Sequence, residues 1–174
     1  MKAVFLDRDG VLTQVVLNSG KPLPPASLKD VVIPADVAAG LKRLKQAGFL
    51  LIVVTNQPDV ARHQTSLDVV TQINQYLRES LPLDDIFVCY HDDAHLCLCR
   101  KPKPGLLLEA AKRYQIDLSK SFMIGDRWKD IEAGQQAGCK TIWMKSAYHE
   151  PMPLTANHTA SSFADATQWI IEQL

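Results

Sequence analysis

The chain has 174 residues, of which 47% are hydrophobic and 22% charged, and its nineteen basic and nineteen acidic residues leave no net charge. This length fits one domain over residues 1–174, and the charge balance lacks the basic surplus of a nucleic-acid binder. Asp7 and Asp9 stand where a signal peptide would need a basic and then apolar run, and no apolar run reaches the roughly 18–20 residues of a membrane span. We therefore expect a cytoplasmic protein without a membrane segment.

Apolar residues alternate along the chain between short continuous runs and segments with helical spacing. Asp36 and Ser66 stand where helix N-caps are expected, and Gly48 and Gly138 stand at predicted helix ends. In chain order, the expected elements are strand 2–6, loop 14–30, helix 37–47, strand 49–54, a helix from 66 to about 79, strand 86–89, helix 105–114, strand 121–124, helix 128–137, strand 141–144, the proline-bearing stretch 151–153 and helix 163–174. This alternation predicts an α/β fold of three layers with a mainly parallel central sheet.

Polar side chains follow three of the predicted strands, and a basic loop precedes a predicted helix. In open α/β sheets, ligands bind beyond the carboxyl ends of the strands, so these groups are expected at one edge. The residues concerned are Asp7 and Asp9, then Thr55, Asn56 and Gln57, then Asp126 and Asp130, together with Arg100 and Lys101 of the basic loop. Each has an ordinary alternative as a turn residue, a helix-start acid or a solvated charge, and their joint position favours a site.

This mixture of side chains suits phosphoryl transfer. Oxygen ligands favour Mg²⁺, which would relieve repulsion between Asp7 and Asp126. Asp7 can then attack phosphorus, while Asp9 protonates the leaving oxygen and later deprotonates water. Thr55 and Lys101 would hold the non-bridging oxygens of the transferred group.

Four motifs in this order resemble those of the haloacid dehalogenase (HAD) phosphatase superfamily: DRDGV at 7–11, VVTNQ at 53–57, RKPKPG at 100–105 and GDRWKD at 125–130. The resemblance implies a Rossmann-like fold, Mg²⁺ dependence and an aspartyl-phosphate intermediate. It makes Asp7 the nucleophile and Asp9 the general acid/base. It also places Mg²⁺ on the Asp7 side chain, the Asp9 backbone carbonyl and Asp126, with Asp130 behind them. About 45 residues separate the first motif from the second, which leaves no room for a folded cap domain, so we expect a capless enzyme.

A second group of ligand-type residues lies in the run CYHDDAHLCLC at 89–99. Cys89, His91, Cys97 and Cys99 would form a Cys3His site typical of structural zinc. His95 competes with His91 for the fourth position, and the alternative to a metal site is a set of buried free cysteines. Zinc would clamp a loop with little apolar material directly before Arg100, and Cys139 outside the group is expected in the core.

The cysteine run narrows the resemblance to the branch that contains D-glycero-D-manno-heptose 1,7-bisphosphate 7-phosphatases and histidinol-phosphatases. That branch implies that Arg100 recognises the second phosphate of the substrate and that Asn56, Gln57 and Arg127 line the pocket. PDVARH at 58–63, GKPLPP at 20–25 and a short cysteine loop depart from the pattern of this branch.

We therefore expect a monomeric phosphoric monoester hydrolase that removes the 7-phosphate of the heptose bisphosphate, a small-molecule phosphate ester. Two alternatives remain within the same chemistry, namely histidinol phosphate or another small phosphomonoester. A third belongs to another class, the phosphoryl-accepting receiver domains.

Overall fold

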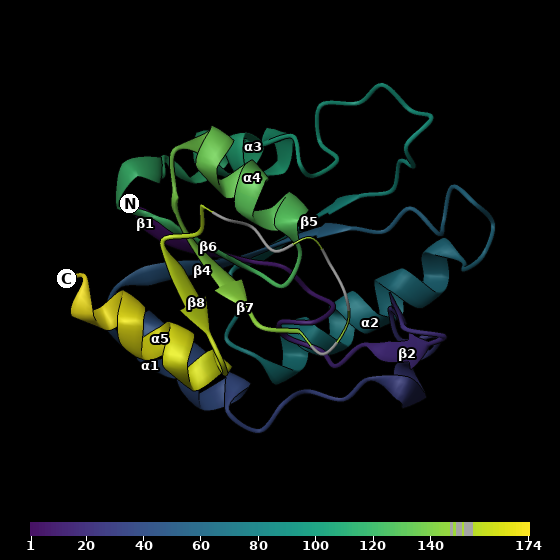
Figure 1. Ribbon diagram of the computed structural model, residues 1–174, viewed down its shortest axis with the longest axis horizontal. Coiled ribbons are helices and arrows are strands. Elements are labelled where there is room, and N and C mark those ends of the chain that lie inside the picture. Colours follow the sequence, from purple (N-terminus) through teal and green to yellow (C-terminus); the bar gives the residue numbers. More distant parts are fainter. Residues whose placement is uncertain (147, 149–150, 152–154) are drawn as a thin grey trace.

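Six parallel strands form the central sheet in the order β5-β4-β1-β6-β7-β8 (Figure 1). The computed structural model describes residues 1–146, 148, 151 and 155–174. The strands of this sheet are β1 (Lys2–Leu6), β4 (Phe49–Asn56), β5 (Asp85–Cys89), β6 (Phe122–Gly125), β7 (Lys140–Met144) and β8 (His158–Ala160). The first strand lies in the middle of the sheet, between β4 and β6, so the chain reverses its winding direction beside the carboxyl end of β1.

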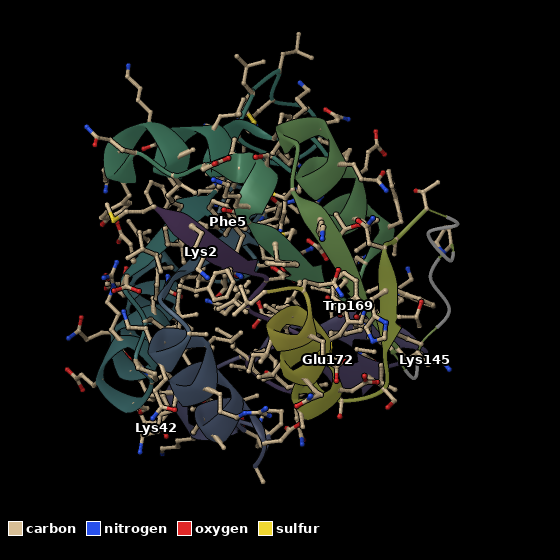
Figure 2. The ribbon with its side chains drawn as sticks, turned by 90° about the vertical axis from the view of Figure 1, so that its left-hand side faces the viewer. Lys2, Phe5, Lys42, Lys145, Trp169 and Glu172 are labelled. Atoms are coloured by element: carbon tan, nitrogen blue, oxygen red, sulfur yellow. The ribbon has the colours of Figure 1, made fainter. Side chains whose placement is uncertain are left out.

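Helices cover both faces of the sheet and complete three layers (Figure 2). They are α1 (Val37–Gln46), α2 (Leu67–Ser80), α3 (Gly105–Tyr114), α4 (Trp128–Ala137) and α5 (Phe163–Glu172). Side chains of β1 alternate between two cores: Val4 and Leu6 pack with α1, α2 and α5, whereas Ala3 and Phe5 pack with α3 and α4. The predicted fold class is therefore confirmed. Within the described part of the chain, no helix combines the length and the apolar character needed to cross a bilayer.

Helix ends follow the sequence expectations with one exception. Ser66 accepts a hydrogen bond from Val69 N at 3.2 Å, and Gly48 and Gly138 take positive φ angles after α1 and α4. Asp36, however, makes no side-chain hydrogen bond to its own helix. Its carboxylate accepts from Ala164 N at 3.0 Å, in the first turn of α5. Asp36 thus stands at the predicted N-cap position of α1, but its side chain joins two neighbouring helices and does not cap its own helix.

Two further expectations need correction. The segment 14–30 is not a plain loop, because β2 (Val16–Asn18) and β3 (Lys21–Leu23) form an antiparallel hairpin, and a 3-10 turn covers Leu28–Asp30. The three-residue strand β8 was not expected, since so short a segment carries little periodicity. Within the proline-bearing stretch 151–153, positions 152 and 153 lie outside the described residues.

Candidate active site

A cavity of about 630 Å³ opens at the carboxyl ends of β1, β4 and β6. The parallel register explains this, because Leu6 pairs with Val53 on one side and with Ile124 on the other, so all three strands end at the same edge. Every residue predicted for the catalytic, substrate and magnesium site lines the cavity: Asp7, Asp9, Thr55, Asn56, Gln57, Arg100, Lys101, Asp126, Arg127 and Asp130.

Three buried carboxylates form the floor of the cavity, and we call Asp7, Asp126 and Asp130 the carboxylate cluster. One oxygen from each lies within 4.8 Å of the others. The ammonium of Lys101 bridges two of them, with its Nζ at 2.7 Å from Asp7 Oδ1 and 2.7 Å from Asp130 Oδ1, and it also donates to the Val54 carbonyl at 2.7 Å. Asp130, which the resemblance placed behind the site, thus contacts the same lysine as Asp7.

The cluster holds more negative charge than Lys101 can balance. Burial raises the pKa of Asp7 to about 6, although Lys101 acts in the opposite direction. Burial, followed by repulsion from Asp7 and Asp130, raises the pKa of Asp126 well above its ordinary value. The pKa of Lys101 is raised, because its two carboxylate partners outweigh the effect of burial. A further positive charge would stabilise the ionised forms of Asp7 and Asp126.

Asp126 shows most directly where such a charge would bind. Both of its carboxylate oxygens are buried and have no hydrogen-bond partner among the described residues. A Cβ atom on Gly10, whose φ is +98°, would collide with this carboxylate, so the turn after β1 requires glycine at that position. Unpartnered buried oxygens beside two more carboxylates fit a hard cation such as Mg²⁺.

Asp9 is held by three side chains. Its Oδ2 accepts from Arg8 Nη2 at 2.8 Å and from Gln57 Nε2 at 2.8 Å, and its Oδ1 accepts from Thr13 Oγ1 at 3.0 Å. Arg8 is only 1% exposed and also donates to Asn74 Oδ1 at 3.0 Å. The sequence analysis did not identify Arg8 or Thr13 as site residues. The one signal for Arg8 was its position between Asp7 and Asp9, inside a motif whose two acids were assigned to the site.

The residues after β4 organise the other side of the cavity. Gln57 Nε2 also donates to Thr55 Oγ1 at 2.9 Å, which links Thr55 to Asp9. Asn56 was predicted to face substrate, and its amide also clamps the backbone of Lys101 through two hydrogen bonds, of 3.0 and 3.1 Å. The lysine that bridges the carboxylate cluster is therefore fixed at its backbone as well as at its ammonium.

The second predicted group also comes together, and we call Cys89, His91, Cys97 and Cys99 the thiol cluster. One ligand atom from each lies within 4.8 Å of the others, with 3.4 Å between His91 Nδ1 and Cys99 Sγ. The shortest sulfur separation is 3.1 Å, between Cys89 and Cys99, and all cysteines are free. His95 lies outside the cluster, where its Nδ1 contacts Asp92 Oδ1 at 2.7 Å.

Electrostatics within the thiol cluster are uneven. Burial raises the pKa of Cys89 to about 12, whereas hydrogen bonds from the Arg100 backbone and from neighbouring thiols overcome the effect of burial and lower the pKa of Cys97 to about 6. Three sulfurs and one imidazole nitrogen at these separations fit a tetrahedral zinc ion. Cys139, in contrast, is buried in the core beneath α3 and α4, as expected.

Comparisons with known proteins identify the class of protein to which this fold belongs. A sequence profile described as HAD-hydrolase-like matches residues 98–169. The crystal structure of a D,D-heptose 1,7-bisphosphate phosphatase from B. bronchiseptica, complexed with magnesium and phosphate, superposes with a TM-score of 0.84 at 25% identity and covers 100% of both chains. The fold is thus that of a HAD-like hydrolase.

Curated relatives define the family more narrowly. A D-glycero-beta-D-manno-heptose-1,7-bisphosphate 7-phosphatase from Helicobacter pylori is 40% identical over 145 residues, which cover 80% of each chain. A D-glycero-alpha-D-manno-heptose-1,7-bisphosphate 7-phosphatase from Photorhabdus laumondii is 31% identical over 174 residues, which cover 93% of this chain and 92% of the relative. The chain therefore belongs to the family of the heptose-1,7-bisphosphate 7-phosphatases.

Proposed function

We propose that the protein is a Mg²⁺-dependent phosphatase that removes the 7-phosphate of a D-glycero-D-manno-heptose 1,7-bisphosphate. The observation that carries the proposal is the pair of unpartnered Asp126 oxygens beside Asp7, in a cavity that also holds Lys101. The names of the relatives support the substrate, and the magnesium and phosphate of the related crystal structure support the cofactor and the reaction.

The proposed magnesium ligands are the Asp7 and Asp126 side chains and the Asp9 backbone carbonyl, with Asp130 supporting them. When bound, Mg²⁺ would supply positive charge that offsets the carboxylate cluster and attracts a phosphoryl oxygen. Lys101 and Thr55 bind the remaining non-bridging oxygens, where negative charge accumulates during transfer.

Asp7 acts as the nucleophile in the first half-reaction. Its carboxylate oxygen forms a bond to phosphorus while the bond from phosphorus to the sugar oxygen breaks, and Asp9 gives its proton to that leaving oxygen. The products of this step are the dephosphorylated sugar and an aspartyl-phosphate on Asp7.

Asp9 then acts as the base in the second half-reaction. It takes a proton from a water molecule, whose oxygen attacks the aspartyl-phosphate and releases inorganic phosphate with restoration of the Asp7 carboxylate. Arg8, Thr13 and Gln57 hold the carboxylate of Asp9 in one orientation beside the cavity, which reduces the entropy lost in each proton transfer.

The thiol cluster supports a structural zinc ion as a second proposed cofactor. Leu96 is 94% exposed and Leu98 is 77% exposed, so the loop buries little apolar surface of its own. Four ligands around one ion would close the loop directly before Arg100 and Lys101, and the metal would thereby fix the approach to the cavity.

A recombinant assay of phosphate release tests the function. Both anomers of the heptose 1,7-bisphosphate are compared with histidinol phosphate, because the relatives are named for both anomers. We expect Mg²⁺-dependent release from a heptose bisphosphate with a kcat/KM far above that for histidinol phosphate. Preference for histidinol phosphate would show that the proposed substrate is wrong and that the proposed reaction is right. Stable phosphorylation of Asp7 without turnover would favour the receiver-domain alternative.

A further inference from the structure

The outer part of the cavity carries mostly positive charge. Its lining away from the carboxylate floor includes five cations, Lys21, Arg62, Arg100, Arg127 and Lys129, whereas the described acids there are Asp59 and the Arg8-bound Asp9. Lys101 and Thr55 already serve the reacting phosphoryl group in the proposed function. The outer cations therefore suit a second anionic group on the same substrate.

Two of these cations already hold an anion supplied by the protein itself. Asp93 Oδ1 accepts from Arg100 Nε at 3.0 Å, and Asp93 Oδ2 accepts from Arg62 Nη2 at 3.1 Å. Arg62 follows β4, whereas Asp93 and Arg100 belong to the loop after β5, and the two segments extend from the same side of the sheet (Figure 1). The carboxylate of Asp93 thus joins two loops across the edge of the cavity.

The Asp93 carboxylate occupies the position of a two-oxygen anion between two guanidinium groups. Its side chain is 68% exposed, while that of Arg100 is only 12% exposed, so the acid can move into water more easily than the arginine can move away. Exposed ion pairs contribute little, whereas a phosphate dianion bonded to two arginines gains charge-assisted bidentate hydrogen bonds. A phosphate at this position would therefore displace Asp93.

We propose that Asp93 limits the preference for a bisphosphate by competing with the second phosphate of the substrate for Arg62 and Arg100. This inference rests on the proposed function and adds to it a residue outside the cavity lining. A substrate with one phosphate leaves Asp93 bound to Arg62 and Arg100, so it gains no binding energy from these two arginines. A bisphosphate displaces Asp93 and binds both arginines. Its net gain in binding free energy is reduced by the contacts that Asp93 loses.

The test compares Asp93→Asn with wild type on matched substrates, heptose 1,7-bisphosphate and heptose 7-phosphate. Removing the competing charge is expected to raise kcat/KM for the bisphosphate by about threefold to tenfold and to leave the monophosphate nearly unchanged. Asp92→Asn is the matched control, because it removes the same charge from the adjacent position, whose carboxylate contacts His95 instead of the arginines. We expect this control to leave the bisphosphate-to-monophosphate ratio unaltered.

A second readout does not depend on the sugar. Pentane-1,5-diol bisphosphate and pentyl phosphate are compared as competitive inhibitors of p-nitrophenyl phosphate hydrolysis, and Asp93→Asn should strengthen inhibition by the bisphosphate alone. If wild type rejects the heptose but this selective gain appears, the proposed substrate is wrong and the competition stands. An equal change for both ligands, no change, or weaker bisphosphate binding in Asp93→Asn would overturn the inference, because Asp93 would then not compete with a second phosphate.

Discussion

The carboxylate cluster and the thiol cluster are both close groups of metal-ligand side chains, but the protein builds them differently. Asp7 and Asp126 follow two adjacent central strands and are buried, and the Lys101 ammonium braces the site. The thiol cluster takes one ligand, Cys89, from the end of β5 and the others from a loop that exposes Leu96 almost fully.

This contrast indicates different dependences on metal. The carboxylate cluster is positioned by the sheet, so a metal ion there would serve charge and chemistry rather than folding. The loop of the thiol cluster has few apolar contacts of its own, so an ion there would supply the contacts that order it. Each cluster should therefore respond differently when one ligand is removed.

The largest expected effect is the loss of turnover in Asp7→Asn. Without the nucleophilic carboxylate, kcat should fall by on the order of 10⁴-fold or more, as for removal of other covalent catalysts. The fold should survive, because repulsion from Asp126 and Asp130 is relieved and Lys101 keeps its contacts with Asp130 and Val54. Stopped assays of phosphate release and metal-free thermal unfolding measure the two quantities.

The matched variant in this comparison is Asp130→Asn, which removes charge from the same cluster without removing the proposed nucleophile. It should retain more activity than Asp7→Asn. A fully active Asp7→Asn enzyme would exclude Asp7 as the nucleophile, and an unfolded one would contradict the view that the sheet positions this cluster.

The second effect concerns Arg8, whose buried guanidinium donates hydrogen bonds to the carboxylate of Asp9. In Arg8→Met, the Asp9 carboxylate keeps Thr13 and Gln57 but loses its guanidinium partner, so kcat should fall by about tenfold to a hundredfold. The loss should be larger for alkyl phosphates, which need a proton on the leaving oxygen, than for p-nitrophenyl phosphate, which does not.

Asn74→Ala separates positioning from stability, because it removes the other partner of Arg8 without touching Asp9. It should lower stability with a smaller effect on the leaving-group dependence. An Arg8→Met enzyme that loses activity equally on both substrate types would show that Arg8 does not act through the proton that Asp9 gives to the leaving oxygen.

The sequence predicted that the acids of the carboxylate cluster would lie together at one edge of the sheet, because two of them directly follow strands. Asp7, Thr55 and Asp126 mark the carboxyl ends of three strands, and parallel strands bring such positions together whatever the details of packing. The helices α1 to α5 and the strands of the central sheet other than β8 were predictable as well, because apolar runs and helical periodicity are local features of the sequence.

What the sequence could not predict depends on partners far along the chain. The burial of Arg8 requires Asn74 of α2, and the contact of Asp36 with Ala164 requires that α1 and α5 be neighbours. The contact of Asp93 with Arg62 likewise joins two loops whose relative position no local pattern encodes. Local patterns therefore predicted the strand ends, but not the side chains that cross from one element to another.

The third effect tests the thiol cluster with two histidines. His91→Ala removes a proposed zinc ligand. Among the described contacts, the His95 side chain meets only Asp92 and the ring of His91, so His95→Ala serves as the control. We expect about one zinc per chain in wild type and in His95→Ala, and less in His91→Ala. Hydrogen exchange should then be faster over residues 90–99 of His91→Ala, with kcat/KM lower by about tenfold because Lys101 and Arg100 follow the loop.

Equal zinc content in both variants would show that His91 is not a zinc ligand. Absence of zinc from wild type would show that the thiol cluster binds no zinc. Unchanged exchange over the β1 and β6 amides would support the contrast between the clusters, since the sheet should not depend on this metal.

The smallest expected effect concerns Asp85, a buried carboxylate that the protein itself satisfies, unlike Asp126. Asp85 accepts hydrogen bonds from Arg78 Nη2 at 2.6 Å, Tyr114 Oη at 2.8 Å, Ile86 N at 2.8 Å and Arg113 Nη1 at 3.1 Å. Burial acts to raise the pKa of Asp85, but these hydrogen bonds outweigh it and lower the pKa below the ordinary value of 3.8. Such a carboxylate is structural, because no oxygen remains to attract a metal.

Asp85→Asn should lower the free energy of unfolding by about 1–2 kcal/mol at pH 7, since both arginines are partly exposed. A depressed pKa in the folded state gives stability that is complete above the unfolded pKa and is lost as the pH falls through the folded pKa. The difference between wild type and Asp85→Asn in urea unfolding should therefore be constant from pH 7 to about pH 5 and shrink toward pH 3. Asp68→Asn, at an exposed position in the first turn of α2, serves as the control. A difference that persists unchanged at pH 3 would mean that shape rather than charge makes Asp85 stabilising, and the contrast with Asp126 would then rest on geometry alone.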